Sequence, residues 1–194
     1  MDLKGFEIIL ASGSPRRQAF FEELGIPFKK EVIPVEETFP ASLQGVAIAE
    51  HIVRQKAAPF QSKIKNKQLV ITADTIVWQY QQCLGKPKDE QEVEAMLTAL
   101  SNASHQVITA VGFLYSDQRE CIHAVSEVRF NKISPQEIRD YIATGSPLDK
   151  AGAYGIQDPF GTVHISEIHG SYTNIVGLPV AQVFEKIKEI IAKE

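Results

Sequence analysis

Residues 68–78, QLVITADTIVW, are nearly all apolar or β-branched. Side chains of this kind favour extended backbone, and a continuous apolar run of this length is typical of a strand buried on both faces of its sheet. The run therefore predicts a central strand with helices packed against both sides. It contains one acid, Asp74, and an ionised carboxylate is costly in such surroundings unless it is paired, binds a metal or faces a cleft. The alternative is that Asp74 caps a bulge or a turn.

The rest of the sequence alternates strand and helix patterns near both ends of the chain, with a hairpin pattern between them. Alternating strands and helices favour a parallel sheet, whereas a hairpin adds antiparallel strands. We therefore expect an α/β fold with a mixed twisted sheet and flanking helices, in a single domain over residues 1–194. The expected strands are residues 6–11, 68–78, 106–115, 120–130 and 163–168, and the expected helices are residues 15–25, 42–58, 89–100, 134–145 and 179–191.

Two arginines, Arg16 and Arg17, fall in the first turn of the helix that we expect to begin at Pro15, after an N-cap at Ser14. Positive charge in a first turn opposes the helix dipole, at about 0.3–1 kcal/mol for each residue. The conflict disappears if an anion binds there, held by backbone N–H groups, the Ser12 and Ser14 hydroxyl groups and a guanidinium. Two solvated arginines after a helix cap are the alternative.

Two lysines and an acidic pair also stand out. Lys56 lies near the middle of the apolar arc of its helix, where a lysine either reaches past the helix end or meets an anion. Lys86 stands between a glycine and a proline, in a turn that directs its ammonium group or is a plain surface turn. Glu36 and Glu37 form an acidic pair in a loop, which is weak evidence alone because exposed acidic pairs are common.

These residues combine several cations with a few acids, as a polyphosphate ester and a divalent ion require. The cations neutralise the oligophosphate, while the carboxylates hold the metal or take a proton from water. The sequence has no GxxxxGK[ST] or GxGxxG loop, no GxSxG elbow and no Cys/His couple. A hydrolase that activates water therefore fits better than one with a covalent nucleophile.

The charge balance limits the partners. Lys and Arg number 20 and Asp and Glu number 24, for a formal net charge of −4, whereas sequence-independent nucleic-acid binding needs a surplus of cations. No apolar run approaches the roughly 18–20 residues that span a bilayer, and residues 1–7 do not resemble a secretory signal. We therefore expect a cytoplasmic protein that binds neither nucleic acid nor membranes. The sequence does not decide whether it forms a homodimer.

The chain carries five motif-like segments, at residues 10–17 (LASGSPRR), 73–77 (ADTIV), 85–87 (GKP), 149–157 (DKAGAYGIQ) and 170–179 (GSYTNIVGLP). In this order they resemble the Maf family of nucleoside triphosphate pyrophosphatases. The resemblance implies hydrolysis of a nucleoside triphosphate to the monophosphate and pyrophosphate, with a divalent cation, Mg or Mn. It also implies a fold similar to that of inosine triphosphatase (Ham1-like) proteins, with two lobes around a deep cleft.

The resemblance also implies roles for individual residues. Asp74 takes the place of the family's proton acceptor. The positions that match phosphate, metal or catalytic contacts are Ser12, Arg17, Glu37, Lys56 and Lys86, among which Glu37 is our candidate metal ligand. The positions that match specificity contacts are Arg16, Thr75 and Gln157.

Residues 149–157 are similar to the branch of the family that acts on dTTP and UTP. The side-chain amide of Gln157 both donates and accepts hydrogen bonds, which suits the edge of uracil or thymine. We expect house-cleaning of these nucleotides, and of modified pyrimidine nucleotides, in the nucleotide pool. Two alternatives stay open: a nucleotide-binding regulator of septum formation without turnover, and a purine-directed enzyme of the Ham1-like type.

Overall fold

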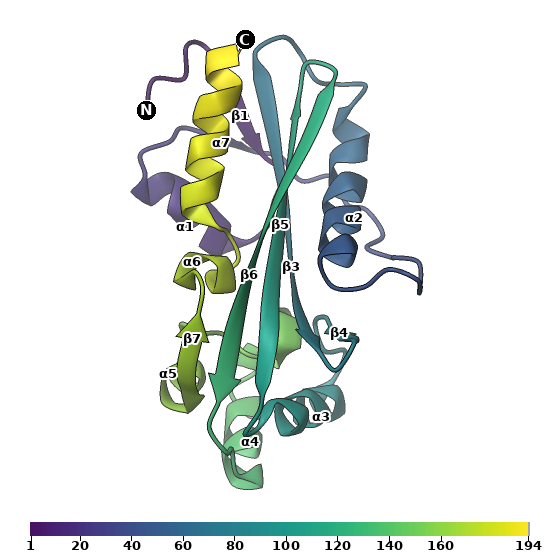
Figure 1. The fold of residues 1–194 in the computed structure, drawn as a ribbon, viewed down its shortest axis with the longest axis vertical. Helices are drawn as coiled ribbons and strands as arrows, with labels where there is room; N and C mark the ends of the chain where they lie inside the picture. Colours follow the sequence, from purple (N-terminus) through teal and green to yellow (C-terminus); the bar gives the residue numbers. More distant parts are fainter. Residues whose placement is uncertain (194) are drawn as a thin grey trace. The chain divides into compact units, whose positions relative to one another are not determined.

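The computed structural model describes residues 1–193, which form a mixed sheet of seven strands with helices beside it (Figure 1). The strands follow the order β2-β1-β3-β5-β6-β7, and the short β4 pairs with β3. The strands are β1 (Glu7–Leu10), β2 (Lys29–Lys30), β3 (Gln68–Gln79), β4 (Gln82–Leu84), β5 (Ser104–Tyr115), β6 (Gln118–Phe130) and β7 (Ile165–His169). The helices are α1 (Pro15–Glu23), α2 (Val46–Ala57), α3 (Glu90–Leu100), α4 (Pro135–Ile142), α5 (Pro159–His164), α6 (Tyr172–Val176) and α7 (Val180–Lys193), with 3-10 turns η1 (Ala58–Phe60), η2 (Ser146–Asp149) and η3 (Ala151–Ala153).

The chain divides into two compact units. Unit 1 comprises Met1–Asp74, Thr109–Ala124 and Gly177–Glu194, and unit 2 comprises Thr75–Ile108 and Val125–Val176. Strands β3, β5 and β6 contribute residues to both units.

In unit 1, β1 pairs in parallel with β2 and with β3, and Leu10 lies opposite Ile71. One face of these strands packs against α1 and α7, through a core that includes Phe21 and Ile187. The other face packs against η1, where Phe60 contacts the cluster of Ile9, Val70 and Leu114, and α2 lies on the same side (Figure 1). Sheet side chains are therefore buried on both faces, which explains the continuous apolar run.

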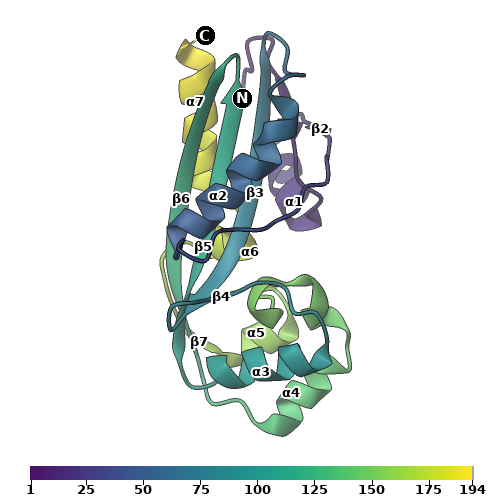
Figure 2. The same cartoon turned by 90° about the vertical axis from the view of Figure 1, so that its right-hand side faces the viewer.

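In unit 2, β4 pairs antiparallel with the end of β3, and β7 pairs antiparallel with β6. Helices α3, α4 and α5 lie together (Figure 2) around an aromatic core. Within that core the Tyr141 and Phe160 rings stack at 4.1 Å with an interplanar angle of 8°.

The expected α/β class, with a mixed sheet and flanking helices, is confirmed. One local prediction was wrong. The chain first forms α5 and enters β7 only at Ile165, because Pro159 and the turn at Asp158 start a short helix. Ser14 is the N-cap residue of α1 with a proline at the start of the helix, as expected; its side chain makes no capping bond, and its amide donates to Ser12 Oγ at 3.3 Å. A single domain with a deep cleft stays a prediction.

No helix within residues 1–193 combines the length and the apolar character needed to cross a membrane.

Candidate active site

Strand alternation directs Asp74 to the face of β3 that α2 covers. Residues two apart on a strand share a face, so Val70, Thr72 and Asp74 point the same way. The Thr72 hydroxyl group donates to the Val53 carbonyl of α2 at 3.0 Å, which fixes the helix beside the strand. Gly112 on β5 permits this approach, because a Cβ there would lie 2.7 Å from Thr72 Oγ1.

Lys56 lies in the last turn of α2 and contacts the Asp74 carboxylate. Its Nζ donates to Asp74 Oδ1 at 2.7 Å and lies 3.1 Å from Glu37 Oε1. The Lys56 and Asp74 side chains are only 17% and 12% exposed, so the pair is well shielded from water. The sequence left two possibilities for this lysine: its ammonium group reaches past the helix end, or it contacts an anion. The ion pair with Asp74 shows that it contacts an anion. Asp74 also lies inside strand β3, so it does not cap a turn.

Arg17 joins three separate segments of unit 1. Its Nε donates to the Gly177 carbonyl at 2.8 Å, and its Nη1 donates to the Ala73 carbonyl at 3.0 Å and to Ser12 Oγ at 3.2 Å. Strand β1 ends at Leu10, so the Ala73 carbonyl lies beyond the last paired residue and needs another donor. The guanidinium supplies that donor and brings its charge next to Asp74.

Burial controls the electrostatics of this cluster. It raises the pKa of Asp74, and the opposing effects of Lys56 and Arg17 are smaller. Burial also lowers the pKa of Arg17, against the attraction of Asp74. A carboxyl whose pKa is moved toward neutral pH is suited to accept a proton from water, because a general base works best with a pKa near the working pH.

The donor set of this cluster fits a hard divalent cation. Mg²⁺ is commonly held by one or two carboxylates, with phosphate oxygens of the substrate and water completing its shell. Asp74 and Glu37 are two carboxylates that share one ammonium partner, Lys56. Within residues 1–193 no group of three or more His, Cys, Asp or Glu side chains is arranged to hold a metal by itself. The role of Glu37 as a metal ligand stays a prediction.

The structure brings five of the predicted residues together in unit 1. They are Ser12, Arg17, Glu37, Lys56 and Asp74. Arg16 lies beside them in the first turn of α1, where its charge lowers the pKa of Arg17.

The remaining predicted residues, Thr75, Lys86 and Gln157, belong to unit 2. Thr75 follows Asp74 in β3, so its side chain points to the opposite face of the strand. Lys86 and Gln157 are both exposed. Their segments are tied to each other, because the Gly152 amide donates to the Gly85 carbonyl at 3.0 Å.

Sequence reasoning missed the backbone groups of this site. The Ala73 and Gly177 carbonyls hold the Arg17 guanidinium, and a carbonyl carries no signal in the residue code. It also missed the buried polar contacts of Lys150 in unit 2, although residues 149–157 were singled out. A lysine inside an otherwise small and apolar segment was the available signal.

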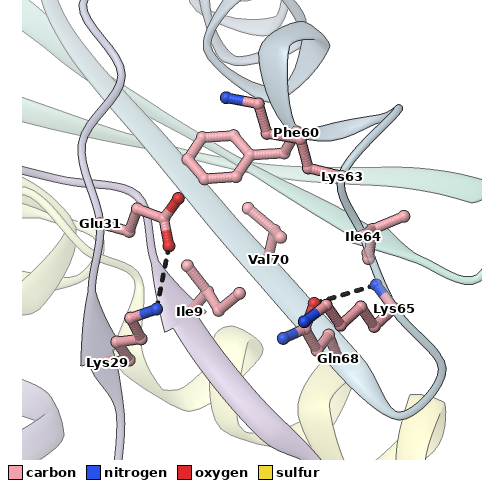
Figure 3. A pocket seen from close by; sticks show the side chains of 9 residues that line it. All are labelled: Ile9, Lys29, Glu31, Phe60, Lys63, Ile64, Lys65, Gln68 and Val70. Carbon is pink, nitrogen blue, oxygen red and sulfur yellow. Dashed lines mark hydrogen bonds and ion pairs between the residues drawn. The ribbon is translucent and has the colours of Figure 1, made fainter.

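A separate pocket of unit 1 has a volume of 190 Å³ and contains none of the predicted residues (Figure 3). Its floor is formed by Ile9, Phe60 and Val70, all nearly fully buried, and lysines stand at its rim. The predicted chemistry lies elsewhere, with Asp74.

This α/β fold thus carries a buried acid, a lysine and an arginine close together, an arrangement that suits an enzyme acting on phosphorylated substrates. The sequence profile described as Maf-like protein matches residues 7–190. The chain belongs to the Maf-like protein family.

Proteins with known names agree with this membership. The chain is 45% identical over 178 residues to the dTTP/UTP pyrophosphatase of Flavobacterium psychrophilum, covering 92% of this chain and 91% of the relative. It is 42% identical over 190 residues to the dTTP/UTP pyrophosphatase of Bacteroides fragilis, covering 97% of this chain and 98% of the relative.

Two solved structures match this chain distantly. The Ham1 protein of Staphylococcus aureus aligns with a TM-score of 0.47 and 15% identity, covering 64% of this chain and 71% of that one. A Ham1 protein of Coxiella burnetii aligns with a TM-score of 0.45 and 17% identity, covering 97% of this chain and 100% of that one. At these scores the similarity carries no inference about this chain.

Proposed function

We propose that the protein is a nucleoside triphosphate pyrophosphatase that hydrolyses dTTP and UTP to the monophosphate and pyrophosphate in the cytoplasm. The observation that carries the proposal is the buried Asp74 carboxylate, of raised pKa, in contact with Lys56 and beside Arg17. The choice of substrate rests on relatives that are 40–45% identical over most of the chain and are named dTTP/UTP pyrophosphatase.

In the proposed reaction, a water oxygen attacks the α-phosphorus and the bond from that phosphorus to the α–β bridging oxygen breaks. The water proton passes to Asp74, and pyrophosphate leaves with the electron pair of the broken bond. Lys56 Nζ contacts Oδ1 of Asp74, so we assign Oδ2 to the water. The ammonium also holds the carboxylate in place, which fixes the direction of proton transfer.

The proposal includes a divalent cation, Mg or Mn, for which Glu37 is the ligand that we assign. When bound, such an ion neutralises phosphate charge and polarises the phosphoryl group. The charges of the Asp74 cluster support a bound cation, because Asp74 and Glu37 offset the charges of Lys56 and Arg17. Arg16 and Lys86 are the further cations that we assign to the phosphate tail.

Thr75 and Gln157 are the residues that we assign to recognition of the substrate. The Gln157 side chain is exposed in its unit and both donates and accepts, as the C=O and N–H groups of uracil and thymine require. Ser12, whose hydroxyl accepts from Arg17, is assigned to the phosphates.

The test is a nucleotide panel with Mg²⁺ or Mn²⁺, scored for pyrophosphate release. We expect dTTP and UTP to be hydrolysed well above ITP, GTP and CTP. A preference for ITP would favour the purine-directed enzyme. Stoichiometric binding of dTTP without pyrophosphate release would favour the regulator of septum formation.

A further inference from the structure

Lys150 is a buried lysine outside the Asp74 cluster. It lies in unit 2 between η2 and η3, and the residue is 8% exposed. A buried ammonium group is costly unless oxygen atoms surround it. It belongs to the segment of residues 146–158, which includes Gln157, so its contacts bear on that segment.

The Lys150 ammonium gathers oxygens from both ends of this segment. Its Nζ donates to the Ser146 carbonyl at 2.6 Å, to Ser146 Oγ at 3.0 Å and to Asp149 Oδ1 at 2.7 Å. It also lies 3.5 Å from Asp158 Oδ2. One cation thus links residue 146 to residue 158 across the intervening turns.

Asp158 is itself fixed from the core of unit 2. Its Oδ2 accepts from Tyr141 Oη at 2.6 Å and from Ser146 Oγ at 2.9 Å. The Tyr141 ring stacks on Phe160, so this acceptor is anchored to packed side chains. Asp158 directly follows Gln157 in the chain. The backbone next to Gln157 is therefore held by these buried contacts.

Glycine at 155 makes room for this arrangement. A Cβ at Gly155 would lie 2.8 Å from Lys150 Cε and 2.8 Å from Asp158 Oδ1. The lysine stem therefore passes against the backbone two residues before Gln157. The same segment reaches the Lys86 turn, through the bond from the Gly152 amide to the Gly85 carbonyl.

We propose that Lys150 is a positioning residue that sets the direction of Gln157, and through it the preference for the base. The Gln157 side chain is exposed, so its direction depends on the backbone that carries it. Its backbone is fixed instead by the network of Lys150, Ser146 and Asp158. This inference rests on the proposed function, because it deepens the assignment of Gln157 to base recognition.

The experiment is a double-mutant cycle of Lys150→Met and Gln157→Ala. For each variant we would measure kcat and KM for UTP and GTP, and the Kd of the non-hydrolysable analogue α,β-imido-UTP. Lys150→Met should raise KM for UTP about tenfold, as expected for loss of one to two well-formed hydrogen bonds. It should change kcat much less and lower the UTP/GTP ratio of kcat/KM. In the Gln157→Ala background, the same change should have little further effect on that ratio.

Two further variants separate positioning from folding. Asp158→Asn keeps the size of the side chain but removes its charge, so it should lower the UTP/GTP ratio in the same direction, by a smaller factor. Lys132→Met, an exposed lysine of unit 2, should leave the ratio unchanged. Hydrogen exchange of the amides of residues 146–158 should accelerate in Lys150→Met and not in Lys132→Met.

Several results would overturn the proposal. They are an unchanged UTP/GTP ratio in Lys150→Met and Asp158→Asn, full additivity with Gln157→Ala, or unchanged amide exchange. If the wild-type protein hydrolyses no nucleotide, the proposed function fails, while the Kd cycle with α,β-imido-UTP still decides for or against the role of Lys150.

Discussion

Replacing Asp74 with asparagine should greatly slow turnover and yet stabilise the fold. Burial raises the pKa of Asp74 above its ordinary value of 3.8. The folded chain therefore retains a proton at pH values where the unfolded chain has lost it. Since stability falls with pH wherever the folded state binds more protons, the wild-type protein loses stability as the pH rises from 3.8 through the folded pKa. Asparagine does not ionise, so the stability of the Asp74→Asn variant does not fall with pH for this reason.

The size of the stabilisation depends on two opposing effects at Asp74, the cost of burying its charge and the attraction of nearby cations. Lys56, 2.7 Å from Oδ1, and Arg17 recover part of the cost of burying the charge, so the net penalty is smaller than for an unpaired acid. We expect about 1 kcal/mol of stabilisation at pH 8, within the range of about 0.5–2 kcal/mol that single stabilising substitutions commonly give. For a chain of 194 residues this raises Tm by about 2–4 °C. The rate should fall by about 10²–10⁴-fold, because the base is lost.

The assay has two parts. Thermal unfolding is followed from pH 4 to pH 9 in chelator, without nucleotide, and pyrophosphate release is measured with saturating UTP and Mg²⁺. The difference in Tm should be largest above the folded pKa and should close toward pH 3.8. Asp140→Asn, an exposed acid on α4, is the matched control and should change neither quantity.

Two results would refute this reasoning. A lower Tm for Asp74→Asn at pH 8 would mean that the ionised Asp74–Lys56 pair stabilises the fold on balance, so the pKa of Asp74 would not be raised. A turnover rate equal to that of the wild type would remove Asp74 from the chemistry.

Three further outcomes are expected. Lys56→Met should lower the unfolding free energy at pH 8 by about 1–3 kcal/mol, as for a buried group that loses its partner, and by less at pH 4, where Asp74 carries less charge; equal losses measured by urea unfolding at both pH values would contradict this. The acidic limb of kcat/KM for UTP should have its midpoint above 3.8, because burial raises the pKa of Asp74; a midpoint at 3.8 would point to an exposed carboxyl. Glu37→Gln should raise the Mg²⁺ concentration for half-maximal rate several-fold while Glu36→Gln does not, and equal effects in a metal titration would remove Glu37 as a ligand.

Much of the fold could be predicted from local pattern. The buried strand β3, the hairpin of β5 and β6, and the helix after the first strand follow from periodicity and β-branched content, which act over a few residues. The short helix α5 could not be found in this way, because Pro159 starts it inside a segment that otherwise has the pattern of a strand. Its length of one to two turns leaves no periodic signal.

The sequence by itself singled out Asp74, Lys56 and Arg17, because each residue type conflicts with its local environment. Only the tertiary structure decided how the conflicts are resolved: strand register turns Asp74 toward α2, and the end of β1 leaves the Ala73 carbonyl to Arg17. The same holds for Lys150, whose partners are backbone and side-chain oxygens brought around it by turns. The sequence shows where a charged residue stands in an unusual place. Its partner depends on which atoms the folded chain brings within hydrogen-bonding distance.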